Sequence, residues 1–169
     1  MTTERVRGDG LLPPAAYTRD DETSDVRFYD CPRKVVHLDD GAIAALGGLY
    51  ADVLTPDGCL LDLMSSWRSH LPDGFRAGQV VGLGLNAEEM ADNPQLTSHV
   101  VHDLNREPRL PFGDEEFDGA MCAVSIQYVL HPLLVFRDVH RVLRPGAPFV
   151  VSLYAGLNRR GVANERVVR

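Results

Sequence analysis

The sequence lacks several features that would assign it to a familiar class. It has no apolar run long enough to span a membrane, and residues 1–10 contain no apolar signal core. Its three cysteines, Cys31, Cys59 and Cys122, have no metal-binding spacing, so no metal site is expected. With 17 Lys and Arg against 24 Asp and Glu, the net charge of −7 argues against a general nucleic-acid binder. These absences favour a cytoplasmic protein with reduced thiols.

What is present fits one folded domain. The chain has 169 residues, of which 44% are hydrophobic, enough to bury a sizeable core. Polar residues 1–25 predict a mobile N-terminal arm, and residues 26–155 predict the domain. Residues 156–169 form a basic tail, for which a solvated segment is favoured over a nucleic-acid site.

Apolar runs and turn signals alternate along the domain. They predict strands near residues 59–64, 79–84, 98–102, 117–124 and 149–153. Helices are expected over 39–53, over a short stretch from Ser65 or Ser66 that Pro72 and Gly74 end, from Ala87, and over 131–143. Strands that alternate with helices predict an α/β fold with a doubly wound parallel sheet.

Three motifs carry a family resemblance. Leu60–Trp67 reads LLDLMSSW, Leu110–Phe112 reads LPF before Phe117-Asp118, and Val142–Gly146 reads VLRPG. In this order and spacing they resemble the class I S-adenosylmethionine (SAM)-dependent methyltransferases, in particular the type-11-like group that acts on small molecules. The resemblance covers about residues 38–153.

The resemblance implies a Rossmann-like sheet of order 3-2-1-4-5. The family normally adds two further strands as a hairpin, and the few residues after Leu153 hardly accommodate one. We therefore expect those strands to be missing and the chain to be a natural or truncated short form. An open sheet edge invites pairing, so a homodimer or a partner subunit is expected.

The resemblance places SAM beside Asp62, whose carboxylate would bind the ammonium of the methionine end. Alternatively, Asp62 caps the turn that follows. Family members have glycines after this acid, whereas this chain has Met64 and Ser66. Their side chains either prevent SAM binding or, with the hydroxyls of Ser65 and Ser66, replace the backbone contacts. Trp67 and His70 could line the mouth of the site, or serve as a core and a surface residue.

The next strand departs from the family as well. Gly84 stands where family members carry the acid that holds the ribose hydroxyls. Leu85 and Asn86 follow, and Asn86 either contacts the ribose or caps the helix from Ala87. Losing a charged hydrogen-bond pair costs about 1.5–3 kcal/mol, which is a roughly tenfold to hundredfold loss of affinity.

Two further segments complete the implied site. Asp103 matches the acid that accepts from the adenine amino group, and Leu104 supplies the neighbouring backbone amide. Ser125 follows the fourth strand, where family members contact the cofactor. Tyr128 or His131 could act as a base, or simply join this loop to the next helix.

Two functions therefore remain open. The first is a SAM-dependent methyltransferase that acts on an oxygen, nitrogen or carbon of a small molecule. The second is a methyltransferase fold that does not methylate, serving either as a partner subunit or as a cyclase or eliminase in biosynthesis. The motifs favour the first, whereas the missing glycines, the missing ribose acid and the short C-terminus count against it and keep the second as the alternative.

Overall fold

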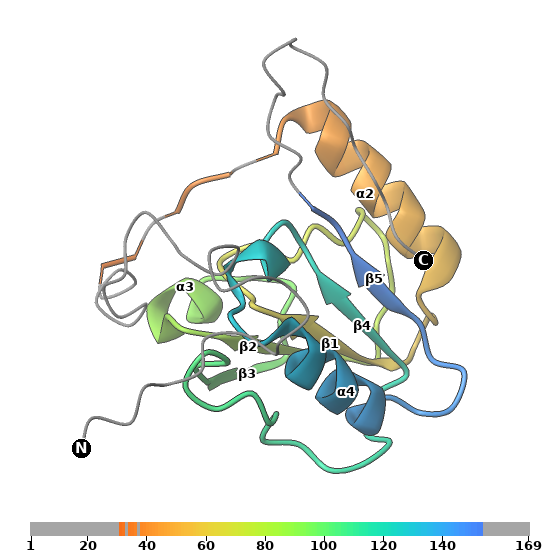
Figure 1. Ribbon diagram of the computed structural model, residues 1–169. Helices are drawn as coiled ribbons and strands as arrows, with labels where there is room; N and C mark the ends of the chain where they lie inside the picture. The colour runs from red at the N-terminus through yellow and green to blue at the C-terminus, as the bar shows by residue number, and fades with distance from the viewer. Residues whose placement is uncertain (1–30, 33, 37, 154–169) are drawn as a thin grey trace, which may run out of the picture.

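The computed structural model describes residues 31–153, except 33 and 37. Within them, five parallel strands form one sheet of order β3-β2-β1-β4-β5, as the resemblance implied (Figure 1). The strands are β1 (Cys59–Leu63), β2 (Gln79–Gly84), β3 (Ser98–Val101), β4 (Gly119–Cys122) and β5 (Phe149–Val151). The sheet reverses direction of winding at β1, and ligands of such sheets bind beyond the carboxyl ends of the strands at that point.

Helices cover both faces of the sheet, which confirms the doubly wound architecture (Figure 1). They are α2 (Asp40–Val53), α3 (Ala87–Ala91) and α4 (Pro132–Val142). Asp39 begins α2 by accepting a hydrogen bond from the amide of Ala42 at 2.8 Å, a standard N-cap. The sequence also predicted α3 and α4 within a residue or two of their bounds.

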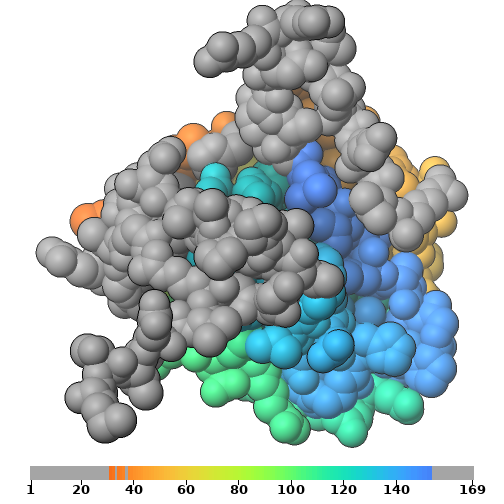
Figure 2. Space-filling view, in the orientation of Figure 1, coloured from red at the N-terminus to blue at the C-terminus, as the bar shows by residue number. Residues whose placement is uncertain are grey.

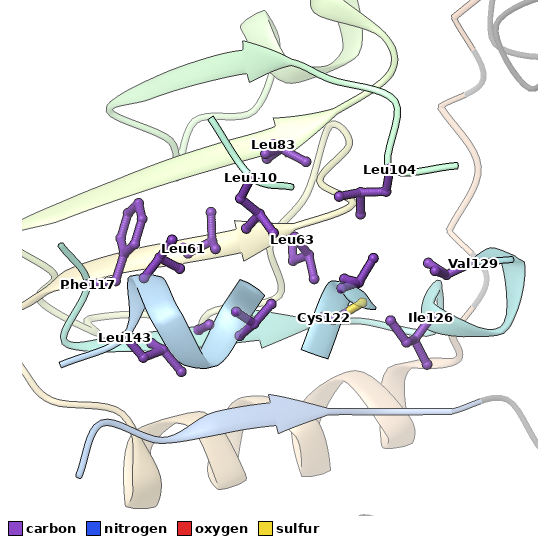
Figure 3. Packing of buried hydrophobic residues seen from close by; sticks show 14 residues of the cluster. Leu61, Leu63, Leu83, Leu104, Leu110, Phe117, Cys122, Ile126, Val129 and Leu143 are labelled. Carbon is purple, nitrogen blue, oxygen red and sulfur yellow. The ribbon is translucent and has the colours of Figure 1, made fainter. Parts of the chain in front are cut away.

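Strand β1 supplies both cores because its side chains alternate between faces. Leu61 and Leu63 belong to the larger cluster, which also contains Cys122 and the inward residues of α4 (Figure 3). Leu60 faces the other way, into the cluster with α2. Asp62 alternates with Leu61 and Leu63, so this carboxylate lies on the α2 side of the sheet.

One predicted element is wrong. No helix follows β1, and residues 64–78 instead form an irregular connection to β2. The serines that resembled helix caps turn their hydroxyls to buried carboxylates instead. Strands β4 and β5 are also shorter than predicted, since β4 spans Gly119–Cys122 and β5 spans Phe149–Val151.

The predicted arm (1–25) and basic tail (156–169) lie outside the described residues, so the domain bounds remain predictions. No described helix is long and apolar enough to cross a membrane. Among the described residues no group of three or more His, Cys, Asp or Glu side chains is placed to hold a metal ion. The three cysteines are free, with Cys31 exposed and Cys122 buried.

Candidate active site

The centre of the candidate site is the buried carboxylate of Asp62, at the end of β1. The hydroxyls of Ser65 and Ser69 both donate to its Oδ2 atom at 2.6 Å. Its Oδ1 atom receives no hydrogen bond from the described residues. Burial raises the pKa of Asp62 to about 6, and the two serine hydroxyls oppose that rise. Asp62 therefore has one oxygen, Oδ2, that already accepts two hydrogen bonds and another, Oδ1, that can still accept one.

A second polar group lies unsatisfied near Asp62. The hydroxyl of Tyr50, on α2, is fully buried and has no hydrogen-bond partner among the described residues. Burial raises the pKa of Tyr50, and the negative charge of Asp62 raises it further. A buried hydroxyl without a partner is uncommon in folded proteins. The sequence counted Tyr50 only as an apolar position of the helix, and nothing in its spacing marked it as functional.

The serine-rich connection is also tied to α3. Ser66 donates to the buried carboxylate of Glu89 at 2.5 Å. Asn93 donates to the carbonyl of Ser66 at 2.9 Å and to the hydroxyl of Ser69 at 3.0 Å. Sequence reasoning missed Ser69, Glu89 and Asn93. Glu89 and Asn93 bind residues more than twenty positions away, and the contact of Ser69 with Asp62 depends on how the irregular connection folds. The result is a buried polar network beyond the ends of β1 and β2.

Gly84 is enclosed by this same connection. A Cβ atom at Gly84 would lie 2.2 Å from the backbone carbonyl oxygen of Ser65, closer than real Cβ atoms approach. The amide of Ser65 also donates to the carbonyl of Leu83 at 2.8 Å, which holds the loop against the end of β2. The missing ribose acid and the missing glycines are therefore linked. With the loop in this position, an acid at position 84 would collide with the backbone of Ser65.

Asn86 adopts the structural alternative. Its side-chain oxygen accepts from the amide of Glu89 at 2.9 Å, and so caps α3. Leu85, directly before it, is partly buried. The structure brings both residues to the same sheet edge as Asp62, with the Asn86 oxygen already engaged.

Asp103 follows β3 at the same edge. Its Oδ1 atom accepts from the amides of Asn105 at 2.9 Å and Arg106 at 3.2 Å, which fixes a turn. Its Oδ2 atom has no hydrogen bond from the described residues. Leu104 beside it is buried in the larger core. Asp103 is thus held rigidly with one oxygen left to accept.

Asn105 connects this turn to the loop after β4. Its side-chain nitrogen donates to the carbonyl of Tyr128 at 3.0 Å, and its oxygen accepts from the amide of Leu130 at 2.7 Å. Tyr128 itself is 52% exposed. His131 lies partly buried just before α4 and makes no capping hydrogen bond. The two base candidates therefore lie near the Asp103 turn, and no described residue forms a side-chain hydrogen bond that would activate either.

The loop after β4 also contains strained backbone. Val124 has a φ of 43°, which a β-branched residue rarely adopts. The side chain of Ser125 donates to the carbonyl of Ala123 at 2.7 Å, and Gln127 donates to that of Val124 at 2.7 Å. Strain of this kind concentrates at functional sites. Ser125 is thus at the predicted place, with its hydroxyl turned to the backbone.

Met64 shows what stands in place of the first of the family's glycines. Met64 has a φ of 59°, the left-handed conformation that glycine adopts without cost. The backbone path of a glycine loop is therefore kept at this position with a larger side chain. Trp67 donates from its ring to the carbonyl of Val35 at 3.3 Å, and the guanidinium of Arg68 lies 4.4 Å from its ring centre. Partial burial lowers the pKa of His70.

The methyltransferase domain family matches residues 65–151, which is more than half of the chain. The chain belongs to this family of class I SAM-dependent methyltransferases. Methyltransferase phqN of Penicillium fellutanum is 32% identical over 83 residues, which are 46% of this chain and 26% of that protein. The chain described here covers about a quarter or less of the length of the curated relatives that it matches.

Solved structures agree with the fold of this methyltransferase-family chain. A putative methyltransferase from Bacillus halodurans superposes with a TM-score of 0.56 at 20% identity, covering 72% of this chain and 55% of that one. The [4+2]-cyclase SpnF superposes with a TM-score of 0.53 at 19% identity, covering 76% and 54%. At this identity, both support the architecture alone.

The family implies SAM, and the described residues fit it at two ends. Asp62 lies at the end of β1 and Asp103 follows β3, and each keeps one carboxylate oxygen that accepts no hydrogen bond from the described residues. Those oxygens suit an ammonium and an adenine amino group. At the ribose position, Gly84 offers no side chain and Ser65 blocks the introduction of one.

Proposed function

We propose that the protein binds SAM at the carboxyl edge of its sheet and transfers the methyl group to a small molecule. The observation that carries this proposal is the pair of carboxylates Asp62 and Asp103, each with one oxygen that accepts no hydrogen bond from the described residues. Asp62 ends β1, the strand at the switch in winding, and Asp103 follows β3 at the same carboxyl edge of the sheet. Family membership supplies the reaction class. The proposal places the protein in the cytoplasm, as its composition favours.

The chain's own residues would act mainly by positioning. Asp62 would accept from the ammonium, Asp103 from the adenine amino group, and the backbone amide of Leu104 would meet the ring. Bound SAM supplies an electrophilic methyl group on a sulfonium. Because that group is reactive, holding an oxygen, nitrogen or carbon nucleophile in line can suffice.

The region after β4 would receive the methyl acceptor. Tyr128 is exposed there, its backbone is fixed by Asn105, and the neighbouring Val124 is strained. Tyr128 or His131 would take a proton from the acceptor where the reaction releases one. We expect such a proton transfer to matter for an oxygen or nitrogen acceptor.

Calorimetric titration of the full chain with SAM and with S-adenosylhomocysteine tests the proposal first. We expect binding in the micromolar range, weakened relative to a site with a ribose acid. The matched variant is Asp103→Ala, which removes the open oxygen and should weaken both ligands roughly tenfold to hundredfold. A folded wild type that gives no heat with either ligand would overturn the proposal.

A second candidate is favoured by the serine-rich connection. Ser65, Ser66 and Ser69 all turn inward, and the Ser65 carbonyl occupies the space at Gly84. A site filled by its own loop suits a protein that no longer methylates and instead assists a partner, or catalyses a cyclisation or elimination. For this candidate, Asp103→Ala should leave partner binding or activity nearly unchanged.

A further inference from the structure

Position 84 is bordered by two residues whose chain neighbours are joined to each other. A Cβ atom at Gly84 would lie 2.2 Å from the carbonyl oxygen of Ser65 and 3.1 Å from the sulfur of Met90. Ser66 follows Ser65 in the chain, and Glu89 precedes Met90. The hydroxyl of Ser66 donates to the Oε2 atom of Glu89 at 2.5 Å. A carboxylate from α3 therefore lies beside the strand position that lacks an acid.

Glu89 is a buried acid that a partly exposed residue covers. Its side chain belongs to a residue that is only 3% exposed, and its backbone is fixed because its amide donates to the side chain of Asn86 at 2.9 Å. Carboxylates are rarely buried this deeply unless hydrogen bonds satisfy them. Ser66 supplies such a bond and is itself partly exposed. Its hydroxyl thus meets the buried acid from a residue that borders the solvent.

A hydroxyl that donates to a carboxylate is also what a ribose offers, because its two neighbouring hydroxyls form charge-assisted hydrogen bonds with acids. We propose that Glu89 accepts from the ribose hydroxyls of the ligand, and that the Ser66 hydroxyl holds this place until the ligand binds. Rotation of the Ser66 side chain exchanges one hydroxyl for another, so the buried acid keeps a donor throughout. This inference rests on the proposed function. It adds a binding residue on α3, whereas family members carry their ribose acid at the end of the strand.

An exchange of this kind makes the internal hydroxyl a competitor of the ligand. Ser66 has to release Glu89 before the ribose can bind, so the wild type loses one hydrogen bond for each that it gains there. Removing the acid should therefore weaken binding, and removing the serine hydroxyl should strengthen it. A contact that only supports the fold predicts no such opposition.

Calorimetry on the full chain tests the exchange with S-adenosylhomocysteine, adenosine and 2′,3′-dideoxyadenosine, which lacks both ribose hydroxyls. We expect the wild type to prefer adenosine over dideoxyadenosine about tenfold, and Glu89→Gln to lose most of this preference. Glu88→Gln is the matched control, because Glu88 is an exposed residue of the same helix and the variant should behave like the wild type. Ser66→Ala should keep the preference, bind S-adenosylhomocysteine about threefold to tenfold more tightly, and melt at a lower temperature without ligand.

The contrary outcomes separate this inference from the proposed function. If S-adenosylhomocysteine binds but the wild type shows no preference for adenosine, or Glu89→Gln keeps the full preference, the role of Glu89 is overturned and the proposed function stands. Unchanged or weaker binding of S-adenosylhomocysteine by Ser66→Ala overturns the exchange, and this arm decides the inference even where Glu89→Gln fails to fold. A wild type that binds none of the three ligands overturns the proposed function and this inference together.

Discussion

At the scale of the residue, Asp62 links burial to the behaviour of the whole protein. It is nearly fully buried, with its pKa raised from 3.8 to about 6 by burial. The folded state therefore holds the proton of Asp62 more tightly than the unfolded state does. Between about pH 4 and pH 6, the contribution of this carboxyl to stability falls as pH rises.

The variant Asp62→Asn isolates that contribution, because its amide oxygen can still accept from Ser65 and Ser69. We expect the difference in unfolding free energy, variant minus wild type, to increase by up to about 3 kcal/mol as the pH rises from 4 to 7, because only the wild type has to ionise a buried carboxyl. Urea unfolding at several pH values measures the difference. Asp118 and Asp138 also have lowered pKa values, but both are present in the wild type and the variant, so their contributions cancel in the difference between the two proteins. Parallel stability curves would contradict the expectation.

The sequence predicted where the two acids lie along the strands, but it did not predict which side chains the polar residues of the site bind. The apolar run that ends at Asp62 placed this residue at the carboxyl end of β1, and the family resemblance placed Asp103 just after β3, where the structure has both. The partners of Ser66 and Asn93 could not be foreseen, because they depend on how the connection 64–78 folds back over α3. Asn86 was left open between two roles, and the structure shows the capping one.

At the scale of the element, the connection after β1 differs most from expectation. The capping potential of Ser65 or Ser66 predicted a short helix there. The hydroxyls of Ser65 and Ser69 instead bind the buried carboxylate of Asp62, and these contacts outweigh local helix propensity. The strands and the other helices were predictable because their apolar periodicity agrees with the burial they reach. Loops that carry buried polar networks have no such periodic signal.

The packing of that connection on β2 predicts the effect of Gly84→Ala. The added Cβ would meet the Ser65 carbonyl, so we expect a loss of about 1–3 kcal/mol of unfolding free energy. Gly48→Ala is the matched control, because a Cβ at Gly48, within α2, meets nothing within 4 Å. That control should gain about 0.5–1 kcal/mol from helix propensity. Chemical denaturation measures both, and a neutral Gly84→Ala would refute the close packing.

At the scale of the whole molecule, the described sheet ends at β5, which pairs with β4. The amide of Ser152 donates to the carbonyl of Cys122, so the amide of the preceding residue, Val151, points to the opposite side. Nearby, α4 lies at the molecular surface with Leu134 and Phe136 more than a third exposed (Figure 2). These features agree with the expected association through the sheet edge.

We therefore expect the full chain to elute as a dimer, or to form one as concentration rises. Val151→Pro removes the outward amide and spares the hydrogen bonds to β4, so it should shift the chain to monomer. Size-exclusion chromatography with light scattering distinguishes the two states. A wild type that stays monomeric at high concentration would count against association through this edge.

The contact between the Ser65 carbonyl and Gly84 also bears on how such a sequence diverges. A side chain can return to position 84 only after the loop has withdrawn, so the two segments have to change in a fixed order. A comparison that scores positions independently treats positions 65 and 84 as unrelated, although the contact between them couples which residues each can hold.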